Sequence, residues 1–184
     1  MLEAAGVPHD AMAAGVDEEA ARASLRAEGL SPRDLADALA ELKVLRVSGR
    51  TPGALVLGCD QLLALDDGTM LDKPADRAAA EVQLRLLSGR THSLWSAAVI
   101  AEGGRPVWRS VDRARMTMRA LSNDFIRAYL DGEYPNISGC VGCYRIEGPG
   151  VQLFAKIEGS QFTIIGLPLL PLLDYLRVRG VMPS

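Results

Sequence analysis

The sequence predicts an α/β protein, because segments with the apolar periodicity of helices alternate along the chain with strand-like segments. The chain has 184 residues, of which 48% are apolar, so it can bury a substantial core in a single domain. We therefore expect one domain over residues 1–184, built on a mixed, strongly twisted central sheet with helices around it.

The first half of the chain alternates helices with an apolar strand. Helices are expected over 20–28 and 31–48, and the second of them has Ser31 as its N-cap. The apolar run over 54–65 predicts a strand, and the Asp-Asp-Gly turn after it predicts that the chain returns antiparallel as far as Lys73.

The second half predicts a helix followed by a hairpin. The helix over 75–87 is expected to bury apolar residues at Ala79, Val82, Leu86 and Leu87. The period then changes to two, which predicts paired strands over 91–101 and 106–118. The remaining expected elements are a helix over 122–130, a glycine-rich segment over 138–150, a strand over 151–157 and a helix over 168–178.

Composition and charge bear on three properties: nucleic-acid binding, membrane insertion and the cellular compartment. A net charge of −3 argues against a surface for nucleic acid, since binding a phosphate backbone requires a basic excess. No apolar run approaches the roughly 20 residues of a membrane span. The expected setting is the cytoplasm, because an odd number of cysteines, three, indicates free thiols in a reducing compartment.

Cys140 and Cys143 form a Cys-x-x-Cys pair that invites a metal interpretation. A four-ligand zinc site would need two more soft ligands, and the only histidines are His9 and His92. We therefore expect small buried thiols in place of a zinc centre.

Asp60 is the strongest indication of function. A carboxylate in a buried strand is costly unless a cation or a metal ion partners it. Lys73 follows across the Asp-Gly turn and is the expected partner. His92 is expected to be structural, because a lone strand histidine is more often a hydrogen-bonded group. Arg90 can complement the dipole of the preceding helix, and phosphate contact is the alternative role for it.

Five short motifs follow one another between residues 58 and 168. They are Gly-Cys-Asp-Gln at 58–61, Asp-Lys-Pro at 72–74, Leu-Ser-Gly-Arg-Thr-His at 87–92, Gly-Cys-Tyr-Arg-Ile-Glu-Gly at 142–148 and Ile-Gly-Leu-Pro at 165–168. In order and spacing they resemble the Maf family of nucleoside triphosphate pyrophosphatases, a family linked to septum formation and to the removal of modified nucleotides. No single motif is specific, but five in register cover nearly the whole chain.

The resemblance implies hydrolysis of the bond between the α and β phosphates of a nucleoside triphosphate, with a divalent metal such as Mg²⁺ or Mn²⁺. Such a substrate needs its charge neutralised and a water molecule placed in line, so hard oxygen ligands and lysines belong in the site. The resemblance also implies two lobes with the nucleotide in a cleft between them, and a homodimer as a candidate assembly.

Four residues match the catalytic positions of the family. Asp60 resembles its essential aspartate, as a metal ligand or as the base for the attacking water, and Glu18 resembles an early acidic residue that would join Asp60 at the metal. Lys43 resembles the first lysine of the family. Lys73 resembles the lysine before proline that neutralises phosphate.

Gln61 and Glu147 are the expected substrate-binding residues. Asp-Gln at 60–61 and Glu-Gly at 147–148 resemble the branch associated with 7-methyl-GTP, whereas the dTTP and UTP branch usually has Asp-Thr and Gln-Gly. A carboxylate at 147 can accept hydrogen bonds from the N1–H and exocyclic amine of a guanine, which a pyrimidine does not offer.

The start of the chain departs from the family pattern. Family members begin with an apolar strand and a Ser-x-Ser-Pro-Arg-Arg type loop for the triphosphate, whereas residues 1–8 read as the closing turn of a helix. We expect that roughly 20 residues of the pattern lie upstream. Two alternatives to an active enzyme of this kind follow: an impaired or inactive nucleotide-binding or regulatory module, and an inosine-triphosphate-type pyrophosphatase with other purine contacts.

Overall fold

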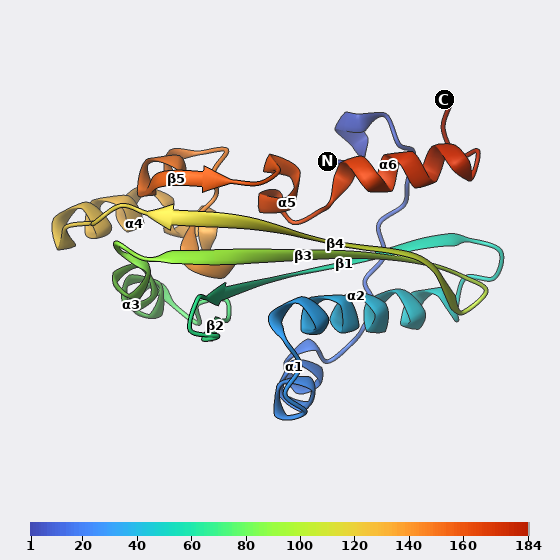
Figure 1. Cartoon of the computed structure of the whole chain (residues 1–184), viewed down its shortest axis with the longest axis horizontal. Helices are drawn as coiled ribbons and strands as arrows, with labels where there is room; N and C mark the ends of the chain where they lie inside the picture. The colour runs from blue at the N-terminus through green and yellow to red at the C-terminus, as the bar shows by residue number, and fades with distance from the viewer. Residues whose placement is uncertain (184) are drawn as a thin grey trace. The chain divides into compact units, whose positions relative to one another are not determined.

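The computed structural model describes residues 1–183 and contains five strands and six α-helices (Figure 1). The strands are β1 Leu55–Leu65, β2 Met70–Leu71, β3 Thr91–Glu102, β4 Arg105–Met118 and β5 Phe154–Glu158. The α-helices are α1 Glu18–Ala27, α2 Pro32–Ser48, α3 Arg77–Leu87, α4 Asn123–Ile137, α5 Gln161–Ile165 and α6 Leu169–Val178. Three short 3₁₀ helices are η1 Glu3–Ala5, η2 Val141–Cys143 and η3 Pro149–Leu153.

The strands form one sheet in the order β2-β1-β3-β4-β5. The expected α/β class and central sheet are confirmed, with one difference in detail: the sheet is antiparallel where a mixed sheet was expected. The reason lies in the connections. Tight turns reverse the chain after β1 and after β3, and α3 carries it from β2 past β1 to β3, which also runs opposite to β1.

The chain divides into two compact units. Unit 1 comprises residues 1–61, 96–112 and 166–184, and unit 2 comprises 62–95 and 113–165. Residue 184 is outside the described residues. The strands β1, β3 and β4 each contribute residues to both units. Each unit therefore has its own helices and core but shares its longest strands with the other.

Unit 1 is a layer of strands between helices. Figure 1 shows α2 along one face of these strands and α6 along the other, and α1 packs against α2. The run from Ala97 to Ala101 in β3 is fully buried, as expected for a strand covered on both faces. Ser31 accepts a hydrogen bond from the Asp34 amide, and Pro32 begins α2, so the predicted N-terminus of this helix is confirmed.

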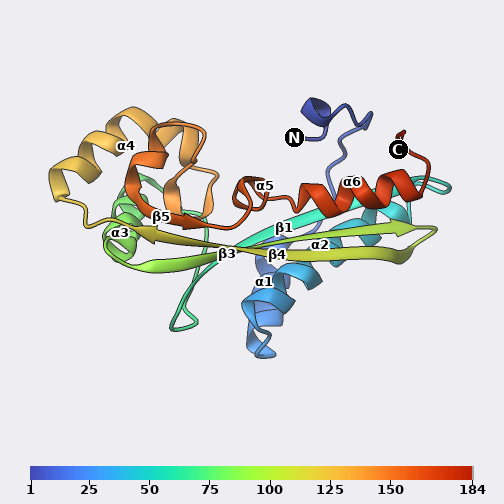
Figure 2. The ribbon, with the colours of Figure 1, turned by 45° about the horizontal axis from the view of Figure 1, so that its top comes forward.

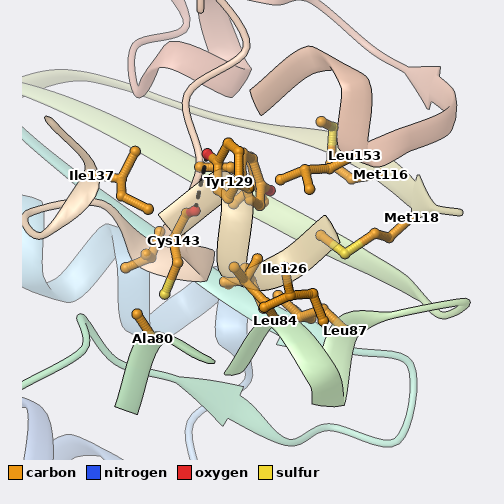
Figure 3. Close-up of a cluster of buried hydrophobic side chains, with 14 of the residues drawn as sticks. Ala80, Leu84, Leu87, Met116, Met118, Ile126, Tyr129, Ile137, Cys143 and Leu153 are labelled. Atoms are coloured by element: carbon orange, nitrogen blue, oxygen red, sulfur yellow. Dashed lines mark hydrogen bonds between the residues drawn. The ribbon is translucent and has the colours of Figure 1, made fainter. Parts of the chain in front are cut away.

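Unit 2 encloses a separate apolar core, shown in Figure 3. Its members include residues of α3, α4, the 3₁₀ segments and the strands β1, β3 and β4, and α3 packs against α4 (Figure 2). Those labelled in Figure 3 are Ala80, Leu84, Leu87, Met116, Met118, Ile126, Tyr129, Ile137, Cys143 and Leu153. The Tyr129 hydroxyl donates to the Cys143 carbonyl at 3.3 Å, which ties α4 to η2.

The face that α3 buries agrees with the predicted one at Leu87 and differs from it at Val82 and Leu86. Ala80, Leu84 and Leu87 are fully buried, whereas Val82 and Leu86 are 61% and 38% exposed. The helix carries apolar residues on more than one face, so its periodicity allows either stripe, and packing against α4 selects the one with i, i+4 and i+7 spacing.

Three boundaries in the second half also differ. α4 continues past Gly132 and through Pro135 to Ile137, because buried side chains at Glu133 and Ile137 hold the additional turns in place. Residues 151–153, expected as the start of a strand, belong to η3 instead, which begins at Pro149, a residue without an amide hydrogen for a sheet. The short helix α5 was not predicted. At the other end, the predicted turn is confirmed, with Gly6 left-handed at φ 71° after η1.

Candidate active site

Asp60 lies on β1 with its side chain 5% exposed. Along this strand Gly58 and Asp60 are buried, while Cys59 and Gln61 are half-buried. Since successive strand residues point to opposite faces, Gly58 and Asp60 share one face and Cys59 and Gln61 the other. The face with Asp60 is the one covered by α2, as the closeness of Gly58 to Ala40 of that helix shows.

Lys43 of α2 is the cation that meets Asp60. Its Nζ lies 2.7 Å from Asp60 Oδ1, and it also approaches the Cys59 carbonyl at 3.5 Å. The prediction that Lys73 is the ion-pair partner is therefore corrected. Proximity along the sequence favoured Lys73, whereas the packing of α2 on β1 brings in a lysine 17 positions before the aspartate.

Glu18 joins the same lysine from the first turn of α1. Its Oε2 lies 3.1 Å from Lys43 Nζ, so one ammonium bridges two carboxylates. Asp17 caps α1 by accepting a hydrogen bond from the Ala20 amide, which fixes where the helix starts and hence where Glu18 points. The side chains are 47%, 18% and 5% exposed at Glu18, Lys43 and Asp60, so the cluster runs from solvent into the interior.

Burial and neighbouring charges have opposing effects on the pKa values of Asp60 and Lys43. Burial raises the pKa of Asp60, and the hydrogen bond and charge of Lys43, with the charge of Arg22, only partly oppose it. For Lys43, burial lowers the pKa, but the bonds to Asp60 and Glu18 outweigh this and the net direction is upward. Lys43 therefore stays charged at neutral pH, next to a carboxylate that takes a proton more readily than usual.

Lys43 contacts one of the two carboxylate oxygens of Asp60. Oδ1 accepts from Lys43, whereas Oδ2 is buried and has no hydrogen-bond partner within residues 1–183. A buried carboxylate oxygen without a partner is costly, so its persistence indicates a ligand. A metal ion or a water molecule could satisfy it.

Gln61 points to the other face of β1. Its amide nitrogen donates to the Ser96 hydroxyl at 2.9 Å, and Ser96 is fully buried on β3. The sequence did not single out Ser96. The only signal was a small polar residue in an apolar strand, and it becomes meaningful once β1 and β3 are known to be neighbours.

The other two predicted residues, Lys73 and Glu147, belong to unit 2, and both are exposed. They lie close enough to Cys140 to affect it: burial raises the pKa of this thiol, the Glu147 charge raises it further and the Lys73 charge lowers it. Thus the structure groups Glu18, Lys43 and Asp60 in unit 1, and Lys73 and Glu147 around Cys140 in unit 2. Cys140 was not predicted to lie at a site.

Two side chains anchor the segment that carries Glu147. Tyr144 is buried, and its hydroxyl lies 2.7 Å from His92 Nε2, so the predicted structural role of His92 is confirmed. Arg145 donates from Nε to Glu133 of α4 at 3.1 Å. Arg90 pairs with Asp67 at 2.8 Å on the surface of unit 2.

The cysteines are free thiols. Cys143 is fully buried and donates to Gln83 at 3.2 Å, and burial raises its pKa to about 12, so the interpretation as a buried thiol is confirmed for this residue. Across residues 1–183, no three histidine, cysteine or acidic side chains are grouped so that they could hold a metal ion by themselves. In the same part of the chain, no helix is long and apolar enough to cross a membrane.

The sequence matches one protein family over nearly its whole length. The model of the family described as Maf-like protein matches residues 1–179. The chain belongs to the Maf family. Three Maf relatives, each called nucleoside triphosphate pyrophosphatase, come from Sphingopyxis alaskensis, Hyphomonas neptunium and Rhodospirillum rubrum, and they are 51%, 53% and 52% identical to this chain. The alignments cover all of this chain and 93%, 92% and 91% of those relatives.

The names of these Maf proteins specify no base. They agree with the activity that the motifs predicted, while the preference for 7-methyl-GTP stays a prediction.

Proposed function

We propose that this chain is a metal-dependent nucleoside triphosphate pyrophosphatase that cleaves the α–β phosphoanhydride to give a monophosphate and pyrophosphate. The observation that carries the proposal is the cluster of Asp60, Lys43 and Glu18, in which the buried Oδ2 of Asp60 has no protein partner within residues 1–183. Family membership and the names of relatives about half identical to this chain support it.

Asp60 acts as the base in this proposal. Lys43 holds Oδ1, which leaves Oδ2 to take a proton from the attacking water. Burial raises the pKa of Asp60, and a higher pKa makes the carboxylate a better proton acceptor near neutral pH. Lys43 keeps the carboxylate oriented, and its charge favours an anionic substrate beside it.

The donor set also fits a divalent metal ion. Asp60 and Glu18 supply the hard oxygens that Mg²⁺ and Mn²⁺ prefer, and they would hold the ion; Oδ2 of Asp60 would then be a metal ligand in place of the base. The absence of a third protein ligand among the described residues suits Mg²⁺, which usually keeps several waters and binds substrate phosphates. When bound, the ion neutralises phosphate charge that develops during cleavage.

Lys73 and Glu147 complete the proposal from unit 2. Lys73 is exposed and can neutralise phosphate, as its resemblance to the family lysine implies. Glu147 is held by an anchored segment and offers two acceptor oxygens to a purine that presents N1–H and an exocyclic amine. On this basis we propose a guanine nucleotide, with 7-methyl-GTP as the specific candidate.

Release of pyrophosphate from a nucleotide panel, with Mg²⁺ or Mn²⁺ and with EDTA, tests the activity. Turnover should require the metal, and Asp60→Asn should lower kcat by about 100- to 10 000-fold, the usual contribution of a general base. Asp124→Asn is the matched control, because that carboxylate is 98% exposed on α4. Nucleotide binding without pyrophosphate release would favour the binding-module alternative, and full activity of Asp60→Asn would refute the role of Asp60.

The preference for guanine is tested with Glu147→Gln. We expect kcat/KM for 7-methyl-GTP and GTP to fall by roughly 10- to 100-fold while that for dTTP and UTP changes little, because only guanine loses a paired acceptor. Glu158→Gln removes an exposed carboxylate from β5 of the same unit and serves as control. An equal loss for all nucleotides, or an ITP preference in the unaltered chain, would count against this assignment.

A further inference from the structure

The contact between β1 and α2 is unusually close at Gly58. A Cβ atom placed on Gly58 would lie 2.6 Å from the Ala40 carbonyl oxygen, 2.8 Å from Val44 Cβ and 2.9 Å from the Val44 amide nitrogen. Two of these atoms belong to the backbone of a helix interior and cannot rotate away. Any side chain at this position would therefore push the helix and the strand apart.

Space is the only evident reason for a glycine at this position. Gly58 is not among the residues with positive φ, so its backbone conformation is open to other residues. Glycine weakens a strand and usually marks the close approach of another backbone. Here that backbone is the turn of α2 between Ala40 and Val44.

This turn of α2 carries Lys43. The lysine precedes Val44, and its Nζ reaches Asp60, which is two positions after Gly58 and on the same face of β1. This close contact between helix and strand is thus directly beside the 2.7 Å ion pair. A wider separation of α2 from β1 would lengthen this pair.

We propose that Gly58 is a positioning residue: because it has no side chain, α2 lies close enough to β1 for Lys43 to hold the carboxylate of Asp60. Gly58 acts through Lys43 and does not touch the substrate. The catalytic consequence rests on the function proposed above, whereas the geometric consequence does not.

Titration of Asp60, followed by ¹³C NMR of its carboxyl carbon, tests the geometry without any substrate. Gly58→Ala should move the Asp60 midpoint to higher pH, because a more distant Lys43 stabilises the carboxylate less. Glu18 and Arg22 also act on Asp60 and remain in place in this variant. In a Lys43→Met background the same substitution should produce no further shift.

Gly132→Ala is the matched control, since a Cβ at Gly132 has nothing within 4 Å. It should leave the Asp60 midpoint unchanged. Val44→Leu adds volume to the same contact from the helix side, so it should shift the midpoint in the same direction and replaces Gly58→Ala if that variant does not fold. An unchanged midpoint in whichever of these variants folds, or an equal shift with and without Lys43, would overturn the proposal.

In the pyrophosphate assay, Gly58→Ala should lower kcat/KM by roughly 10- to 100-fold, the range expected when a catalytic group is misplaced by about 1 Å. Its acid limb should move to higher pH together with the NMR midpoint. If the unaltered chain releases no pyrophosphate, the proposed function fails while the NMR result still decides the role of Gly58. A shifted midpoint with unchanged kcat/KM would remove the catalytic part of the proposal.

Discussion

Burial is the largest influence on the pKa values of the buried residues Asp60 and His92, and neighbouring charges act against it. Asp60 and His92 are both buried, and burial disfavours the charged form of each: it raises the pKa of the aspartate and lowers that of the histidine. Asp60 differs in having Lys43 in contact, which gives its carboxylate a partner. His92 is hydrogen-bonded to the Tyr144 hydroxyl, and the charge of Asp66 does not outweigh burial, so it stays neutral at neutral pH.

His92 should make the stability of the protein depend on pH. Burial lowers its pKa from 6.5 to about 4 in the folded state, so between these values the unfolded chain binds the extra proton. Stability is therefore complete above pH 6.5 and is lost as the pH falls towards 4, by about 3 kcal/mol in all. Urea unfolding at several pH values measures this loss.

His92→Gln should flatten the pH dependence in this window, although it lowers stability at pH 7 by disturbing the bond to Tyr144. His9→Gln is the control, because His9 is exposed near the N-terminus and should leave the slope as it was. A slope that persists in His92→Gln would show that another group is responsible.

Two glycines allow neighbouring elements to approach more closely than any other residue would. The strand β1 and helix α2 meet at Gly58, and η3 approaches the backbone of Arg145 at Gly150, where a Cβ would collide with the Arg145 carbonyl oxygen. Gly132 is different, because it lies inside α4 with open space around it. A side chain therefore fits at Gly132 but not at Gly58 or Gly150.

This difference predicts opposite effects on stability. Gly132→Ala should raise the free energy of unfolding by about 0.5–1 kcal/mol, because alanine favours a helix and costs less conformational entropy. Gly150→Ala should lower it, since the Arg145 backbone has no room to move away. The denaturant midpoints of the two variants measure both effects. Stabilisation by both would show that steric contact at Gly150 is unimportant.

The whole molecule consists of two units joined by three shared strands. Each unit has its own core, but β1, β3 and β4 have residues in both units. Disruption of one of these strands is therefore expected to affect both units. Each unit also holds one of the two tryptophans: Trp108 stacks on Tyr175 in unit 1, and Arg113 lies over Trp95 in unit 2.

The shared strands predict cooperative unfolding. In Trp95→Phe and Trp108→Phe, the remaining tryptophan reports on unit 1 and unit 2, respectively, and the fluorescence midpoints in urea should coincide once stability differences between the variants are corrected by circular dichroism. Two separate transitions within one variant would show that the units unfold independently in spite of their common strands.

By itself, the sequence determined the kinds of element and the chemistry they carry. Apolar runs and caps such as Ser31 depend on neighbours along the chain, so β1 with its buried Asp60 and the start of α2 were predictable. Motif order also placed the chain in its family. These features need no knowledge of which elements pack together.

Tertiary structure decided the partners. The cation on Asp60 is Lys43 and not Lys73, α3 buries Leu84 and exposes Val82, and Gln61 meets Ser96. Each outcome depends on which surfaces come into contact and how closely, and residues far apart in sequence supply those surfaces. At Gly58 the deciding quantity is the separation of a helix from a strand, which packing sets and local sequence pattern does not encode.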